Sequence, residues 1–229
     1  KQHDPDGALT EARAALELWK YNPVAFYLMG LAWLEKGDPA QARINLEKAI
    51  DLKPDYADAH IAWAQLLWQQ GDRRAALEGF DKAVAVAPDL PEAHYNRGLA
   101  AAGNGDSARA MSEFREALAL RPDYLQARLN LGLALLGQGE KTAAVREFRI
   151  AVQQDPSFSE AHNNLGLALL ESGDVNEAVK ELREALRLKP GYAHAHYNLG
   201  LALKRRGDLA ASAEEFFRAR ELDPSLPPP

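Results

Sequence analysis

The sequence predicts an all-α protein, a solenoid of stacked helix-turn-helix repeats, and three observations support this fold class. Prolines recur every 34 residues, at Pro54, Pro88, Pro122, Pro156, Pro190 and Pro224. Glycines keep the same step, at Gly37, Gly71, Gly105, Gly139, Gly173 and Gly207. On either side of each glycine, apolar residues recur three and four positions apart, which is typical of amphipathic helices. One helix pair cannot bury its apolar face alone, so neighbouring pairs are expected to stack.

The 34-residue period divides the chain into one partial repeat, six full repeats and a short tail. Residues 1–22 are expected to supply only the second helix of a repeat, which suggests an array cut from something longer. The full repeats are expected at residues 23–56, 57–90, 91–124, 125–158, 159–192 and 193–226, and the tail at residues 227–229.

The fifth repeat illustrates how each element of the unit is specified. Its first helix is expected to end at Gly173, because glycine adopts a left-handed backbone at low cost. Asp174 is expected to accept from the free N–H groups that open the second helix. Pro190 lies where that second helix must stop. Small residues at Gly166 and Ala178 would let the two helix axes approach closely.

Composition and charge argue against several classes of function. The formal net charge is -6, and the densest basic cluster is the run Lys204, Arg205 and Arg206. A nucleic-acid surface needs many more such contacts, so no nucleic-acid partner is expected. No apolar run approaches the ~18 residues of a membrane span. The chain contains no cysteine, which excludes disulfides and zinc-thiolate sites and leaves its compartment open.

The residues that carry a family resemblance recur in each repeat. In the fifth repeat they are His162, Leu165, Gly166, Leu169, Ala178, Leu182, Ala185 and Pro190. This pattern resembles the tetratricopeptide repeat, and the match covers essentially the whole chain. It departs from the family at the first position, where histidine or another residue replaces the usual tryptophan. The resemblance implies a right-handed superhelix whose first helices line a concave groove, and function is expected on that groove.

Four asparagines share one position on the predicted first helices: Asn96, Asn130, Asn164 and Asn198. A side-chain amide can donate to and accept from a peptide group, whatever the side chains of that peptide are. This run is similar to the peptide-backbone ladder in the repeat region of O-linked N-acetylglucosamine transferases, and the similarity implies a peptide-binding ladder. The alternative is that asparagine at this position only helps to pack the helix.

The rest of the predicted groove is mostly apolar. Its residues are expected to be Trp68, Tyr95, Leu99, Leu133, Leu136, Asn163, Leu167, Tyr197 and Leu201. Family members that bind acidic peptide tails carry lysine at matching positions, which here hold Asp58, Glu92, Gln126 and Glu160. We therefore expect a protein partner that supplies an extended or helical, largely apolar peptide. The alternative is that the leucines contact one another across a tightly coiled superhelix.

The third repeat is short of side-chain volume. Residues 101–103 read Ala-Ala-Gly beside Trp68, so the gap is either a pocket for a ligand side chain or a loosely packed helix. Arg97 takes the place of a buried leucine. Because a buried unpaired charge is costly, we expect it to reach solvent or to pair with an acid such as Glu92 or Asp58.

No catalytic site, metal site or cofactor is predicted. Consecutive members of the in-phase histidines lie a repeat apart, too far to share a zinc ion, so we expect them to pack between helices; they are His60, His94, His162 and His196. No nucleophile arrangement or phosphate-binding glycine loop is present. We expect a non-catalytic interaction scaffold. The alternatives are a substrate-recognition arm of a larger enzyme, such as a glycosyltransferase, and a repeat array that self-associates through exposed ends.

Overall fold

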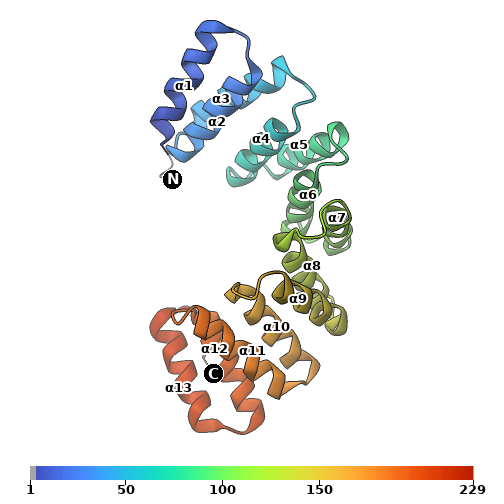
Figure 1. The fold of residues 1–229 in the computed structure, drawn as a ribbon, viewed down its shortest axis with the longest axis vertical. Helices are drawn as coiled ribbons and strands as arrows, with labels where there is room; N and C mark the ends of the chain where they lie inside the picture. The colour runs from blue at the N-terminus through green and yellow to red at the C-terminus, as the bar shows by residue number, and fades with distance from the viewer. Residues whose placement is uncertain (1–3, 229) are drawn as a thin grey trace. The chain divides into compact units, whose positions relative to one another are not determined.

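The computed structural model describes residues 4–228, and most of them are helical. Within that range the structure contains thirteen α-helices and no strand (Figure 1). The helices are α1 Pro5–Leu18, α2 Pro23–Glu35, α3 Pro39–Leu52, α4 Ala57–Gln69, α5 Arg73–Val86, α6 Pro91–Gly103, α7 Ser107–Leu120, α8 Leu125–Gly137, α9 Lys141–Gln154, α10 Ser159–Ser172, α11 Val175–Leu188, α12 Ala193–Arg206 and α13 Leu209–Leu222. The predicted all-α class is therefore confirmed.

The chain forms two compact units, Lys1–Leu120 and Arg121–Pro229. In the first unit, α1 packs on α2, and three helix pairs follow, α2 with α3, α4 with α5 and α6 with α7. In the second unit the pairs are α8 with α9, α10 with α11 and α12 with α13. Neighbouring first helices also touch within each unit, α4 with α6, α8 with α10 and α10 with α12. Within each unit, consecutive pairs therefore stack as a solenoid requires, while the repeat boundaries remain a prediction.

The turn inside each helix pair is built on a left-handed glycine. Gly173 has a φ of 96° and ends α10, as predicted. The cap by Asp174 was predicted wrongly, because its side chain makes no cap hydrogen bond. Backbone bonds close that turn instead, with Asp174 N donating to Leu169 O at 2.9 Å. The side chain of Asp72, at the equivalent position before α5, does accept from Ala75 N at 3.1 Å.

Close approach of the two helices in a pair depends on small residues. A Cβ atom added at Gly166 would lie 2.5 Å from Cγ of Leu182, and one added at Gly200 would lie 2.9 Å from the ring of Phe216. Such contacts are shorter than packed carbon atoms allow. The alanines that recur every 34 residues on the second helices are fully buried, at Ala49, Ala83, Ala117, Ala151, Ala185 and Ala219.

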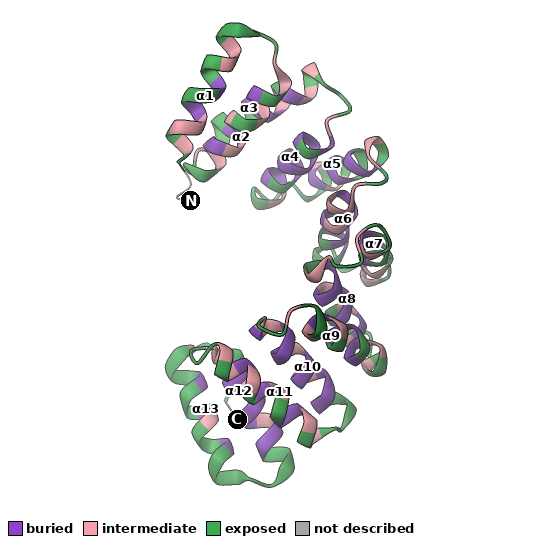
Figure 2. Ribbon diagram, viewed as in Figure 1, coloured by how far each residue is buried: buried purple, intermediate pink, exposed green. Residues whose placement is uncertain are grey.

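Burial follows the stacking of the helices. Buried residues gather where helices meet, and the terminal helix α13 is mostly exposed (Figure 2). The largest fully buried side chains in the described range include Phe114 and Phe148, both on second helices. None of the helices in residues 4–228 has the length and apolar character needed to cross a membrane.

Candidate functional site

The first helices of the pairs carry the residues predicted to bind a ligand. We call their outward side chains the first-helix surface, on α2, α4 and α6 in the first unit and on α8, α10 and α12 in the second. A cleft of about 350 Å³ opens between α4 and α6, and its lining is Gln65, Trp68, Gln69, Phe80, Asn96, Leu99 and Ala100. The structure thus brings together three predicted site residues, Trp68, Asn96 and Leu99.

Both polar atoms of the Asn96 amide make hydrogen bonds within the first unit. Its Nδ2 donates to the carbonyl oxygen of Glu92 at 2.8 Å, and its Oδ1 accepts from Nε2 of Gln65 at 2.7 Å. Asn96 is 9% exposed. Asn96 therefore holds Gln65 in place at the edge of the cleft. The side chain of Gln65 is exposed and lies nearer to solvent than that of Asn96.

Three asparagines in the second unit form a network between α10 and α12. Nδ2 of Asn198 donates to Oδ1 of Asn163 at 2.9 Å, and Nδ2 of Asn163 donates to Oδ1 of Asn164 at 3.2 Å. Asn163 and Asn198 are buried, whereas Asn164 is half-buried, and its Nδ2 makes no hydrogen bond within residues 4–228. On α8, Nδ2 of the half-buried Asn130 donates to Gln126 O at 2.8 Å. The four predicted ladder residues thus divide between the units and differ in burial.

The predicted apolar residues differ in how far they reach solvent. Leu99 and Leu133 are 37% and 43% exposed, and the others on this surface are half-buried, namely Leu136, Leu167 and Leu201. Tyr95 and Tyr197 are half-buried against their own second helices, with ring centroids 6.0 Å from Phe114 and 5.4 Å from Phe216. The leucines are therefore better placed than the tyrosines to meet a ligand.

The volume gap predicted in the third repeat is partly filled. A Cβ atom added at Gly103 would lie 2.5 Å from Cζ2 of Trp68, so the indole covers this glycine. The guanidinium of Arg73 lies 3.8 Å from the ring centroid of Trp68, a favourable cation–π geometry. Trp68 is thereby fixed as one wall of the cleft between α4 and α6.

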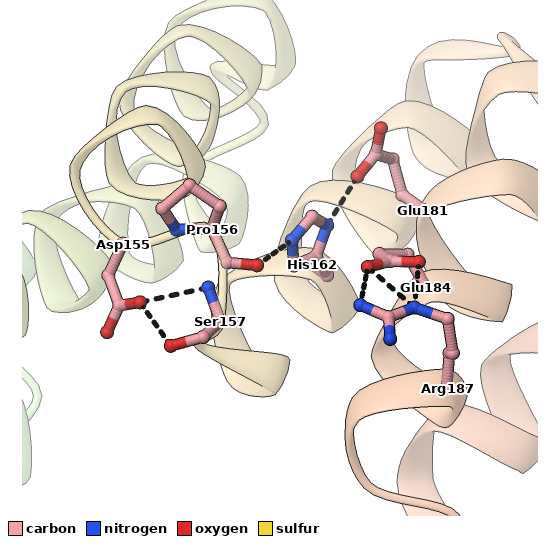
Figure 3. A network of polar contacts seen from close by, with 7 residues as sticks. All are labelled: Asp155, Pro156, Ser157, His162, Glu181, Glu184 and Arg187. Atoms are coloured by element: carbon pink, nitrogen blue, oxygen red, sulfur yellow. Dashed lines mark hydrogen bonds and ion pairs between the residues drawn. The ribbon is translucent and has the colours of Figure 1, made fainter.

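The in-phase histidines each tie a proline turn to a helix pair. Nε2 of His162 bonds the carbonyl oxygen of Pro156 at 3.1 Å, and Nδ1 bonds Oε2 of Glu181 at 2.7 Å (Figure 3). His94 bonds Pro88 and Glu113, and His196 bonds Pro190 and Glu215, in the same way. The predicted packing role is thus accompanied by hydrogen bonds to a proline carbonyl and to a glutamate of the second helix, which sequence reasoning missed.

The signal for these pairs was present in the sequence. Glutamates recur every 34 residues at Glu113, Glu147, Glu181 and Glu215, each nineteen residues after the histidine position. In the fourth repeat Arg128 fills the histidine position, with Nη1 2.8 Å from Glu147 Oε2 and Nη2 2.6 Å from the Pro122 carbonyl oxygen. The position therefore selects a donor to two acceptors, not histidine itself.

Arg97 pairs with acids, as expected, but its partners lie on the second helices of two pairs and are not the Glu92 or Asp58 that were named. Its Nη2 lies 2.7 Å from Oε1 of Glu113 on α7, and its Nη1 lies 3.6 Å from Oδ1 of Asp81 on α5. The buried carboxylate of Glu113 therefore bridges the guanidinium of Arg97 and the ring of His94.

The start of α10 carries an anion where acid-binding relatives carry lysine. Burial raises the pKa of Glu160, but hydrogen bonds from Ser159 and Lys189 outweigh it and leave the pKa below its usual value. Nζ of Lys189 lies 3.1 Å from Oε1 of Glu160. An ionised carboxylate at this position disfavours an acidic peptide.

In the first unit, burial raises the pKa of Tyr27 to about 12, and the nearby Asp58 and Tyr56 add to this rise.

The described residues offer no group of side chains that could bind a metal ion. Within residues 4–228, no cluster of three or more histidine, aspartate or glutamate side chains has the arrangement of a metal site.

Several solved structures are similar to this chain. MamA from Desulfovibrio magneticus RS-1 is 27% identical, with a TM-score of 0.67 over 75% of this chain and 97% of that one. YrrB, described as a TPR protein with an unusual peptide-binding site, is 24% identical, with a TM-score of 0.65 over 79% and 93%. PilF of Pseudomonas aeruginosa is 21% identical, with a TM-score of 0.78 over 89% and 93%. Among curated proteins, no similar sequence was found.

The family assignment rests on the sequence itself. The tetratricopeptide repeat model matches residues 1–57, 61–124, 103–157, 129–193 and 163–227, which together span nearly all of the chain. The stacked helix pairs and the left-handed glycine turns agree with that match. The chain therefore belongs to the tetratricopeptide repeat family.

Proposed function

We propose that this interaction scaffold binds a largely apolar peptide segment of another protein on its first-helix surface. The observation that carries the proposal is the cleft between α4 and α6, where Trp68 forms a wall and Leu99 is 37% exposed. Exposed leucine beside a fixed indole gives an apolar side chain a place to be buried, and clefts of this size commonly hold side chains or small ligands. The similar protein YrrB is described as having an unusual peptide-binding site, which supports a peptide as the class of ligand.

Polar groups beside the cleft would orient the peptide backbone. Gln65 donates through Nε2 to Asn96, and its amide oxygen makes no hydrogen bond within residues 4–228, so it can accept from a peptide N–H. In the second unit, Nδ2 of Asn164 can donate to a peptide carbonyl. In this proposal Asn96 and Asn198 act by positioning their neighbours. A peptide bound on the first unit meets Gln65 directly, and a peptide bound on the second unit meets Asn164 directly.

The polar and apolar groups together favour a peptide over an acidic ligand. The apolar residues Leu99 and Leu133 have no basic neighbour on the predicted clamp positions, and Glu160 carries a negative charge there. An acidic tail would therefore lose its hydration without gaining a cationic partner. The enzyme-arm and self-association alternatives remain predictions, since neither has a contact in the described residues that favours it over peptide binding.

A selection from a displayed random-peptide library tests the proposal. Wild type, Leu99→Glu and Ile44→Glu are used as parallel baits, because Ile44 is an equally apolar, 59% exposed residue on the second helix α3. We expect wild type and Ile44→Glu to enrich one apolar motif that Leu99→Glu does not enrich. Enrichment of the same motif by all three baits, or of no motif by wild type, would remove the first-helix surface as the binding site.

A further inference from the structure

One helix pair breaks the pattern of histidine and glutamate. Nineteen residues after His60 stands Gly79, where the other histidine-bearing pairs have Glu113, Glu181 and Glu215. Nε2 of His60 keeps its bond to the Pro54 carbonyl oxygen at 2.9 Å. Its other nitrogen, Nδ1, forms no hydrogen bond with any residue in the range 4–228. His60 as a whole is only 8% exposed, but its unpartnered Nδ1 is not fully buried, so this nitrogen can be reached by a ligand.

A cleft occupies the place of the missing carboxylate. It has a volume of about 600 Å³ and lies between α3, α4 and α5, within the first unit. His60 and Gly79 line it, and Ile50, Trp63 and Ala85 give it apolar walls. His60, whose Nδ1 has no partner, therefore lines a cleft that is large enough to hold a long side chain of a ligand.

The hydrogen bond to Pro54 decides what kind of group His60 can accept. A carbonyl oxygen only accepts, so Nε2 must carry the hydrogen that it shares with Pro54. In the neutral imidazole, Nδ1 then carries a lone pair and no hydrogen. With the ring in this neutral form, a ligand that completes the site brings an N–H or O–H donor.

The charges around the cleft favour a cation. Its lining contains four carboxylates and one ammonium group, namely Glu47, Asp51, Glu78, Asp81 and Lys82. Glu47 and Glu78 pair with Arg43 and Arg74 one turn away on their own helices, and Asp81 pairs with Arg109 and Arg97. The two i,i+4 pairs are solvent-exposed and weak, so their carboxylates can turn to a bound cation. Asp51 makes no ion pair within the described residues.

The sixth repeat provides an internal comparison. A cleft of about 610 Å³ lies in the equivalent place in the second unit, lined by His196, Glu215 and the basic residues Arg183, Arg187 and Arg218. There Nδ1 of His196 bonds Oε2 of Glu215 at 2.6 Å. The same cleft therefore occurs twice, once with its own carboxylate and a basic rim, and once with an open acceptor and an acidic rim.

We propose that the cleft between α3, α4 and α5 binds a lysine or arginine side chain of a protein partner. The N–H group of that side chain donates to Nδ1 of His60, its methylene groups pack on Trp63 and Ile50, and the carboxylates at the rim balance its charge. An indole wall also suits a cation. This site is separate from the first-helix surface and does not depend on peptide binding there.

The test uses two short peptides that differ only in charge. Acetyl-Gly-Arg-Gly-amide and acetyl-Gly-citrulline-Gly-amide are titrated into the full ¹⁵N-labelled chain, and the indole N–H resonance of Trp63 is followed. Nε1 of Trp63 lies 3.3 Å from Oε1 of Glu47 in the cleft, and the resonance is assigned by its loss in Trp63→Phe. We expect saturable shifts with the arginine peptide and at least about tenfold weaker binding of the citrulline peptide.

The matched variant rebuilds the arrangement of the other pairs. A Cβ atom at position 79 would lie 2.8 Å from Cβ of Ala64, and the other pairs have glycine at the equivalent of Ala64, for example Gly98 and Gly200. The double variant Ala64→Gly/Gly79→Glu therefore supplies a carboxylate to His60 and removes the closest contact, and the ring of Trp63, 3.1 Å from the added Cβ atom, has to shift slightly. We expect it to abolish the shift of Trp63 on adding the arginine peptide.

A second variant keeps the proposal testable if the double variant Ala64→Gly/Gly79→Glu does not fold. Asp51→Lys/Glu78→Lys changes two exposed residues and is expected to weaken binding of the arginine peptide at least about tenfold. Equal binding of the arginine and citrulline peptides, no shift with either, or unchanged affinity in this variant would overturn the proposal. Trp63 shifts that depend on protein concentration without peptide would assign the cleft to a second copy of the chain and would overturn it as well.

Discussion

His162 shows how a single side chain can join two elements of a repeat. Its ring links the carbonyl of Pro156, in the turn before α10, to the carboxylate of Glu181 on α11. Both contacts are shielded from water, because the histidine side chain is 8% exposed. Hydrogen bonds to charged groups contribute more than neutral ones, so this ring stabilises the pair beyond its own packing.

Replacing the histidine should therefore cost more where the glutamate is present. His162→Ala is expected to lower the free energy of unfolding by about 2 to 4 kcal/mol, because it removes two hydrogen bonds and leaves Glu181 unpaired. His60→Ala removes only the contact with Pro54 and is expected to cost about 1 kcal/mol. Urea denaturation followed by circular dichroism measures the free energy of unfolding of both variants. Equal losses would show that the pairing with glutamate adds nothing to stability.

At the scale of elements, the spacing of two helices in a pair is set by glycine. Gly166 on α10 faces Leu182 on α11, and no space remains for a methyl group between them. The same relation holds between Gly132 and Phe148, where an added Cβ atom would lie 2.5 Å from the ring. Each pair is thus packed around a contact that a larger residue would force apart.

An alanine substitution separates this packing role from helix propensity. Gly166→Ala is expected to destabilise the protein by about 1 to 3 kcal/mol, because the added methyl group overpacks the contact with Leu182. Gly137 ends α8, and an added Cβ atom there meets nothing within 4 Å. Gly137→Ala is therefore expected to stabilise by about 0.4 to 1 kcal/mol. Thermal unfolding of both variants checks the prediction, and the same sign for both would contradict it.

The ion pair of Glu160 and Lys189 connects the start of α10 to the residue that caps α11. Because the pKa of Glu160 is lowered in the folded protein from its ordinary value of 4.5, its stabilising effect is complete above that value and is lost as the pH falls below it. Glu160→Gln should therefore lower stability at pH 7 by less than about 1 kcal/mol and should not differ from wild type in strong acid. Urea midpoints across the acid range test this, and a difference that persists in strong acid would argue against the ion pair.

At the scale of the whole chain, periodicity predicts the fold well and the site less well. The 34-residue step places Gly173 in a turn and Gly166 at a close contact, since both follow from backbone geometry that repeats without change. The partner of an amide depends on neighbouring side chains instead, so the bond between Gln65 and Asn96 could not be read from the repeat. The same holds for Arg97, whose acidic partner Glu113 lies across the turn on the second helix.

Salt should separate the two proposed binding sites. The first-helix cleft is mostly apolar, so affinity for a peptide selected there should change by less than about threefold between about 0.05 M and about 0.5 M NaCl. The cleft at His60 is lined mainly by acids, so the arginine peptide should bind markedly more weakly at the higher concentration. Isothermal titration calorimetry of each peptide measures both effects, and strong salt dependence at the first-helix surface would point to a charged ligand.

The central claim is that the first-helix surface binds an apolar peptide. Its most direct test is the affinity, by isothermal titration calorimetry, of the peptide that wild type selects for three proteins: wild type, Leu99→Glu and Ile44→Glu. We predict that Leu99→Glu weakens binding at least about tenfold, because it places a charge in the apolar contact, and that Ile44→Glu leaves the affinity unchanged. Equal affinity for wild type and Leu99→Glu would contradict the claim and move the binding site away from the cleft between α4 and α6.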